Sequence, residues 1–129
     1  MGLRRLLRLW LPVVFWAILI FYLSGIPDLK TGFEFDFLLR KISHVIEYAI
    51  LVFLLYRAFA GSCENINRLY LFIYPASLTL LYAISDELHQ SFVPGRNCSI
   101  RDILIDSIGI PVFYFINFII LRKKIKTTF

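Results

Sequence analysis

Hydrophobic residues gather in four long runs along this chain, and short polar segments separate them. The pattern predicts helices over about 6–23, 38–60, 69–92 and 99–121. Each run is long enough to cross a membrane, because about 20 residues at a rise of 1.5 Å span about 30 Å. Gly and Pro residues at 25–27 and 94–95 end the first and third runs, since both residue types interrupt a helix.

These runs predict an all-α fold, namely a polytopic membrane protein built as a four-transmembrane-helix bundle. Composition agrees, because 59% of the residues are hydrophobic and the mean hydropathy is +0.73. A soluble domain has only about 45–50% apolar residues. We expect a single domain over residues 1–129, since no repeat or linker divides the chain.

The net charge of +5 does not indicate a nucleic-acid partner, because the basic residues lie in the polar gaps and near both termini. With the N-terminus inside, nine Lys and Arg residues lie on the cytoplasmic side and five lie outside. Positive residues favour the cytoplasmic side, so we expect both termini there, Cys63 inside and Cys98 outside. No A-x-A pattern follows the first run, so we expect it to stay as an anchor rather than be cleaved.

The polar residues meet at one end of this predicted bundle. The second helix begins outside, the third ends outside and the fourth begins outside, so their outer ends share one depth. The polar residues at these ends are Lys41, His44, Glu47, Asp86, Glu87, His89, Gln90, Asp102 and Asp106. An inverted orientation would keep this meeting and move it to the cytoplasmic face.

Helical spacing places these residues on one stripe of each helix, because positions three or four apart are neighbours. The stripes are Lys41, His44 and Glu47; Asp86, Glu87 and Gln90; and Asp102, Asp106 and Gly109. Gly109 has no side chain, so we expect a neighbouring helix to approach it closely.

Acids outnumber fixed cations in the inward set. The acids are Glu47, Asp86, Glu87, Asp102 and Asp106, and the cations are Lys41, Arg96 and Arg101. A charge at the bilayer centre costs about 2.5–3.5 kcal/mol, so these groups need partners. Protonated carboxyls, a charged His44 or His89, or a bound cation could balance the excess.

Three motifs carry these residues. They are Lys41-x-x-His44-x-x-Glu47-Tyr48, Ser85-Asp86-Glu87-x-His89-Gln90-x-Phe92-x-Pro94-Gly95-Arg96 and Asp102-x-x-x-Asp106-x-x-Gly109. Together they resemble the VanZ-like family of small polytopic bacterial membrane proteins. The family usually has Asn at the position of Asp106, so this chain departs from the pattern by one added charge.

The resemblance implies a protein of the bacterial cell envelope, in the inner membrane. The namesake of the family is linked to low-level resistance to teicoplanin, a lipoglycopeptide antibiotic that targets cell-wall precursors. The resemblance therefore implies a lipid-linked or cell-wall-related ligand, or a glycopeptide, and an effect on antibiotic resistance.

One hypothesis is an enzyme that acts on a lipid headgroup. Glu87 or Asp86 would serve as the general base, and His44 or His89 would carry the proton. Arg96 and Lys41 would hold a phosphate or carboxylate, which Arg does well through paired hydrogen bonds.

A second hypothesis is a binding protein without catalysis, and a third is a scaffold held by ion pairs. The expected ligand-binding residues are Lys41, Glu47, His89, Gln90, Arg96, Asp102 and Asp106. A transporter is disfavoured because the polar groups crowd one end. The sequence thus leaves open whether the chain is an enzyme.

His44-x-x-Glu47 puts two possible metal ligands one helical turn apart, and Asp86, Glu87 and His89 could complete a site. Such side chains suit zinc, iron or manganese. No spacing matches a known zinc signature such as H-E-x-x-H, so we predict no metal and specify no cofactor.

Overall fold

In the computed structural model, helices are the only regular elements of the residues described, which are 2–27, 36–63, 65–95 and 98–127. The elements are α1 (Leu3–Ser24), α2 (Asp36–Ser62), α3 (Arg68–Gln90), α4 (Ile100–Ser107) and α5 (Gly109–Thr127). The all-α prediction is confirmed. The first three predicted helices match the observed bounds to within about three residues, as helix ends usually do.

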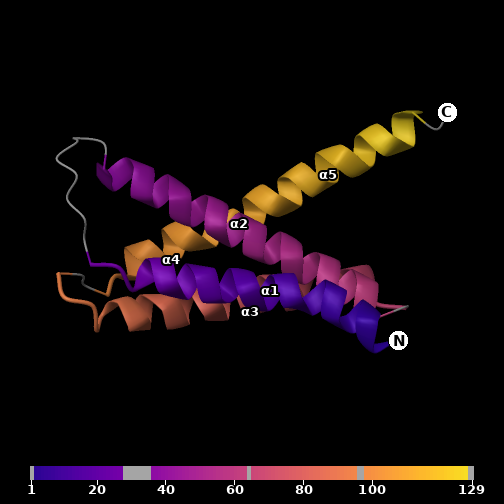
Figure 1. The fold of residues 1–129 in the computed structure, drawn as a ribbon. Helices are drawn as coiled ribbons and strands as arrows, with labels where there is room; N and C mark the ends of the chain where they lie inside the picture. The colour runs from indigo at the N-terminus through magenta and orange to yellow at the C-terminus, as the bar shows by residue number, and fades with distance from the viewer. Residues whose placement is uncertain (1, 28–35, 64, 96–97, 128–129) are drawn as a thin grey trace.

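Helix α2 is the centre of the bundle and contacts each of the other helices. Figure 1 shows α1 next to α3, α2 crossing the line of α4 and α5 near their junction, and α5 running on from that crossing to the C-terminus. Both chain termini lie at one end of the molecule. At the opposite end α1 and α3 finish and α2 and α4 begin. The chain order therefore brings the polar starts and ends of α2, α3 and α4 to the same end.

The outer faces of the bundle are apolar. Three segments are long and apolar enough to cross a membrane, namely Leu3–Ser24, Arg68–Gln90 and Ile100–Ile120. Large side chains on them point outward, with Phe15 67% exposed and Phe115 66% exposed. Contiguous apolar surface of this kind suits lipid tails rather than water. The structure thus has three candidate spans, and a crossing by α2 as well stays a prediction.

The predicted fourth helix, 99–121, corresponds to the candidate span Ile100–Ile120, and the structure interrupts it by one turn residue, Ile108, between α4 and α5. Pro111 is the physical reason. Its nitrogen carries no hydrogen, so it cannot bond to the carbonyl of Ser107, and its ring crowds that carbonyl. Ile108 instead closes a tighter turn by donating to Ile105 O at 3.0 Å. Pro12 and Pro75 lie inside helices that continue past them.

Gly109 allows α2 to approach the start of α5 very closely, as predicted. A Cβ atom at this position would lie 2.6 Å from Ala49 N and 2.7 Å from Val45 O. Both are backbone atoms of α2, and a rigid helix cannot move them aside as it could a flexible side chain. The contact fixes where α4 and α5 meet α2.

Two hydrogen bonds from α1 hold it in place in the bundle. Trp16 Nε1 donates to the Glu47 carbonyl at 2.9 Å, and Ala17 O accepts from the Tyr82 hydroxyl at 2.5 Å. A core of buried apolar residues lies beneath these bonds. It consists of Val13, Ile20, Tyr48, Leu51, Leu55, Ala58 and Ala83.

We predict that Gly109→Ala destabilises the protein by about 1–3 kcal/mol, the usual cost of overpacking. The added methyl group must push against the α2 backbone. The measurement is reversible unfolding in mixed detergent micelles. Gly2→Ala is the matched control, because a Cβ there has nothing within 4 Å. Equal stability of the two variants would contradict the close contact.

Candidate functional site

Three carboxyl side chains are buried where α2, α3 and α4 come together. Asp86 and Asp106 are each 2% exposed, and Glu87 is 0% exposed. Buried carboxyls are uncommon and need hydrogen bonds or a counter-charge. We call these three residues, with His44, Tyr48 and Gln90, the polar cluster. Its members come from the sequence stripes on α2, α3 and α4, and Tyr48 adds a phenol.

Asp86 is held by two donors at the same oxygen atom. The Tyr48 hydroxyl donates to Asp86 Oδ2 at 3.2 Å, and Gln90 Nε2 donates to it at 2.9 Å. Gln90 Nε2 also donates to Ser24 Oγ at 2.9 Å, which ties α1 to the cluster. Asp86 Oδ1 is buried and has no hydrogen-bond partner among the described residues.

His44 and Asp106 face each other between α2 and α4. Nδ1 of His44 lies 3.5 Å from Oδ1 of Asp106, and the His44 side chain is 13% exposed. The second oxygen, Asp106 Oδ2, has no partner within the described part of the chain. A charged His44 would pair with Asp106, whereas a neutral His44 offers a nitrogen lone pair.

Glu87 attaches α3 to the start of α4. Its Oε1 accepts from the Ser99 backbone N–H at 2.6 Å. Ser99 is also the N-cap of α4, since its hydroxyl oxygen accepts from Arg101 N at 3.2 Å. Glu87 Oε2 is buried and, among the described residues, no donor reaches it. One carboxylate oxygen of Glu87 therefore joins two helices, and the other is buried without a hydrogen-bond partner among the described residues.

Lys41 and Asp102 form an ion pair between α2 and α4 at the rim of the cluster. Their side chains are 16% and 27% exposed, so this pair is less buried than the carboxyls below it. Partly exposed pairs contribute roughly 1 kcal/mol or less. The pair joins α2 to α4 at the edge of the cluster, and its own contribution to stability is small.

Two predicted site residues differ in their place relative to the cluster. His89 lies apart from it and stacks on Phe21 of α1, with ring centroids 3.9 Å apart and planes at 20°. Glu47 is half-buried beside the cluster, where its carboxyl interacts electrostatically with His44, and its backbone oxygen accepts the Trp16 bond. Arg96 lies outside the described residues, so its predicted role is still a prediction.

Three contributors were missing from the predicted site. Tyr48 follows His44 by four residues, so the helical period alone could have placed its hydroxyl on the same face. Ser24 and the Ser99 backbone N–H could not be found in this way. Their contributions depend on how α1 and α4 dock against α3, which no local pattern specifies.

Comparisons with known proteins find similarity to membrane proteins. A family model described as VanZ/LLP1 matches residues 7–121. A curated relative, the uncharacterized membrane protein YwnJ of Bacillus subtilis (strain 168), is 30% identical over 112 residues. The alignment covers 81% of this chain and 72% of that protein. No solved structure matches the chain.

We predict that Tyr48→Phe destabilises the protein by about 1–2 kcal/mol, because Asp86 loses one of its donors in a buried setting. Tyr22→Phe is the matched control, since Tyr22 is 69% exposed on α1. The measurement is the free energy of unfolding of both variants in detergent. The Asp86 network would be contradicted if removing the Tyr48 hydroxyl cost no more than removing that of Tyr22.

Proposed function

The chain is a membrane protein of the VanZ/LLP1 family, and we propose that it binds a lipid-linked or cell-wall-related ligand at the polar cluster. We further propose that this activity changes susceptibility to glycopeptides such as teicoplanin. The observation that supports the proposal most is a set of buried carboxyls at one end of the bundle, each with an oxygen atom that has no hydrogen-bond partner among the described residues.

The burial of the carboxyl groups is energetically costly. Removing one ion from water costs several kcal/mol in a real protein, even after relaxation. Apolar residues of similar size would hold the helices together as well or better. Ionisable residues inside a membrane protein commonly mark a ligand or ion pathway. Asp86, Glu87 and Asp106 together thus support a functional site over simple packing.

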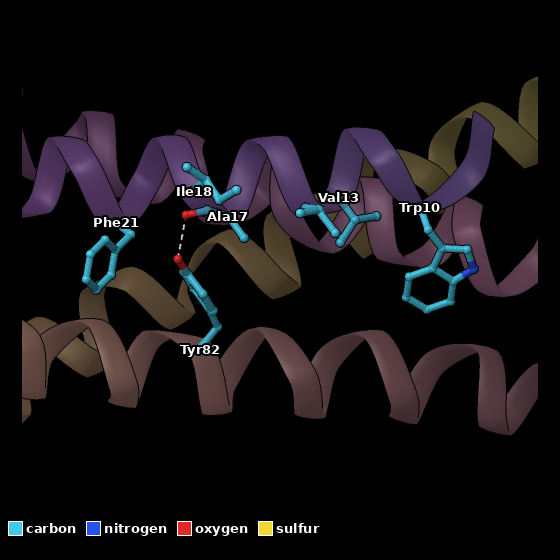
Figure 2. A pocket seen from close by; sticks show the side chains of 7 residues that line it. Trp10, Val13, Ala17, Ile18, Phe21 and Tyr82 are labelled. Carbon is cyan, nitrogen blue, oxygen red and sulfur yellow. Dashed lines mark hydrogen bonds between the residues drawn. The ribbon is translucent and has the colours of Figure 1, made fainter. Parts of the chain in front are cut away.

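An apolar groove between α1 and α3 supports a ligand with a hydrocarbon chain. The groove has a volume of about 410 Å³. Figure 2 shows Trp10 and Phe21 extending from α1 towards α3, and Tyr82 reaching from α3 to the Ala17 carbonyl. The other lining residues are Val13, Val14 and Ile18.

The groove leads towards the polar cluster. A second hollow shares Ile18 and Phe21 with the groove, and it continues to Gly25 and His89. Gly25 and His89 are the chain neighbours of Ser24 and Gln90, which are hydrogen-bonded to each other at 2.9 Å. A lipid tail in the groove would therefore have its headgroup beside Gly25 and His89, at the end of the bundle where the polar cluster lies.

The proposed topology has four membrane spans in the bacterial inner membrane, with both termini in the cytoplasm. Figure 1 shows the two termini at the same end of the bundle, which fits an even number of crossings. The excess of Lys and Arg near that end favours the cytoplasmic side. The polar cluster would then face the outer leaflet, where lipid-linked wall precursors are used.

A second candidate function is headgroup chemistry, with Glu87 or Asp86 as the general base. Its supporting observation is that each of these residues keeps one oxygen atom without a hydrogen-bond partner among the described residues. An open oxygen atom can accept a proton from a bound substrate, whereas an oxygen already held by donors is less basic. His44 would then carry the proton onward.

The orientation can be checked with the cysteines, which are both free and exposed. We expect a membrane-impermeant maleimide added to intact cells to label Cys98 in a Cys63→Ser chain. Cys63 in a Cys98→Ser chain should be labelled only after lysis, which is the control for reactivity. The reversed result would move the polar cluster to the cytoplasmic face.

The function can be checked by mass spectrometry of envelope lipids and wall precursors. The cells compared would express the wild type, Glu87→Gln or no protein. We expect a lipid-linked species to change in abundance or to copurify with the wild type alone, because Glu87→Gln removes one buried charge at constant size.

Each outcome has a distinct meaning. A new mass that depends on Glu87 would establish the enzyme, and the mass shift would give the reaction class. Unchanged profiles with altered glycopeptide susceptibility would establish binding without catalysis. If neither quantity differs between wild type and Glu87→Gln, the proposal is overturned and the cluster is a helix clamp.

A further inference from the structure

We infer that His44, Asp86 and Asp106 form a binding site for one divalent transition-metal ion. The three residues come from α2, α3 and α4, so one ion would link the three helices that meet at the polar cluster. This metal site does not require the lipid-linked ligand proposed above, and ion binding can be measured without that ligand.

The geometry fits a single ion. Each residue offers one ligand atom, and these three atoms all lie within 4.8 Å of one another. Two atoms that bind the same ion at about 2.0–2.4 Å can be at most about 4.8 Å apart. The side chains therefore need only small rotations to close on an ion.

The two carboxyls are unsatisfied without a cation. Asp86 and Asp106 are each 2% exposed, and each has one buried oxygen atom with no hydrogen-bond partner in the described part of the chain. Nδ1 of His44 is buried as well and makes no hydrogen bond that meets the usual geometry. Buried polar atoms of this kind are rare in native structures and indicate an ion or a water molecule.

The surroundings of Asp86 are those of a metal ligand. Tyr48 and Gln90 both donate to Asp86 Oδ2 and so fix the orientation of the carboxylate. The opposite oxygen, Oδ1, is left for a different partner. Carboxylates that bind metals are usually hydrogen-bonded in this way by neighbouring side chains.

The donor set indicates the class of ion. One imidazole and two carboxylates suit Mn²⁺, Fe²⁺ or Zn²⁺, whereas Cu⁺ prefers thiolates. A divalent ion would also neutralise two carboxylates in a region where an unpaired charge is costly. Three protein ligands leave coordination positions open for water or for an oxygen of a bound headgroup.

The metal site considered from the sequence shares His44 and Asp86 with this one, and it includes Glu47 where the structure adds Asp106. Asp106, which is 62 positions further along the chain than His44, faces the imidazole. Ligands that come from three separate helices have no fixed spacing in the sequence, so no motif can predict them.

The test is Mn²⁺ binding to the full chain in lipid nanodiscs, followed by electron paramagnetic resonance. Both exposed cysteines are replaced by Ser, so that thiols add no sites. We expect one saturable Mn²⁺ per chain, competed by Zn²⁺. Asp106→Asn should weaken the affinity by at least about 10-fold.

The two histidines supply a matched pair of variants, since the chain has no others. His44→Asn should abolish the site, and His89→Asn, which removes the ring stacked on Phe21, should leave Mn²⁺ binding unchanged. Pulsed resonance on the wild type should detect one imidazole nitrogen coupled to Mn²⁺, which requires no variant to fold.

Three results would overturn the inference. They are no saturable Mn²⁺ binding, equal affinity of wild type and Asp106→Asn, or bound Mn²⁺ without a coupled imidazole nitrogen. Any of these would favour a proton shared between the carboxyls, or a charged His44 paired with Asp106. Failure here would leave the lipid comparison with Glu87→Gln unaffected.

Discussion

The cost of holding carboxyls away from water is the constraint on which this structure depends. Asp86, Glu87 and Asp106 are almost completely buried in a protein whose outer faces are apolar. In such a setting each carboxyl oxygen needs a donor, a proton or a cation. Helix α2 contacts every other helix of the described residues, and it supplies the Tyr48 hydroxyl to Asp86 and the His44 imidazole to Asp106.

The close helix contact at Gly109 and the polar cluster are two parts of one arrangement. Gly109 lets the backbone of α2 approach at Val45 and Ala49, which directly follow His44 and Tyr48 in the chain. Asp106 lies about one helical turn before Gly109, so the same contact brings its carboxylate to His44. The break at Ile108 then lets α4 follow α3 while α5 continues along the second half of α2.

Most of the fold could be predicted from the sequence, because hydrophobic runs and their Gly and Pro boundaries are local signals. Most of the cluster could be predicted as well, since helical spacing puts His44 and the Asp86–Gln90 pair on inward stripes. It could not decide whether His89, next to Gln90, would face α4 or α1, because that depends on packing. The break before Gly109 was missed for a related reason: Pro111 can bend, end or merely interrupt a helix, as Pro12 and Pro75 illustrate.

Hydrogen bonding distinguishes the structural part of the cluster from the part open to a ligand. The oxygens Asp86 Oδ2 and Glu87 Oε1 accept bonds that join helices, so they hold the bundle together. Their partner oxygens have no such bond among the described residues and add only the cost of burial. Gln90 joins the cluster to α1, because one amide nitrogen bonds both Asp86 and Ser24. A cation at the carboxyls would therefore lie in a hydrogen-bonded network that reaches α1, which a clamp made only of ion pairs does not require.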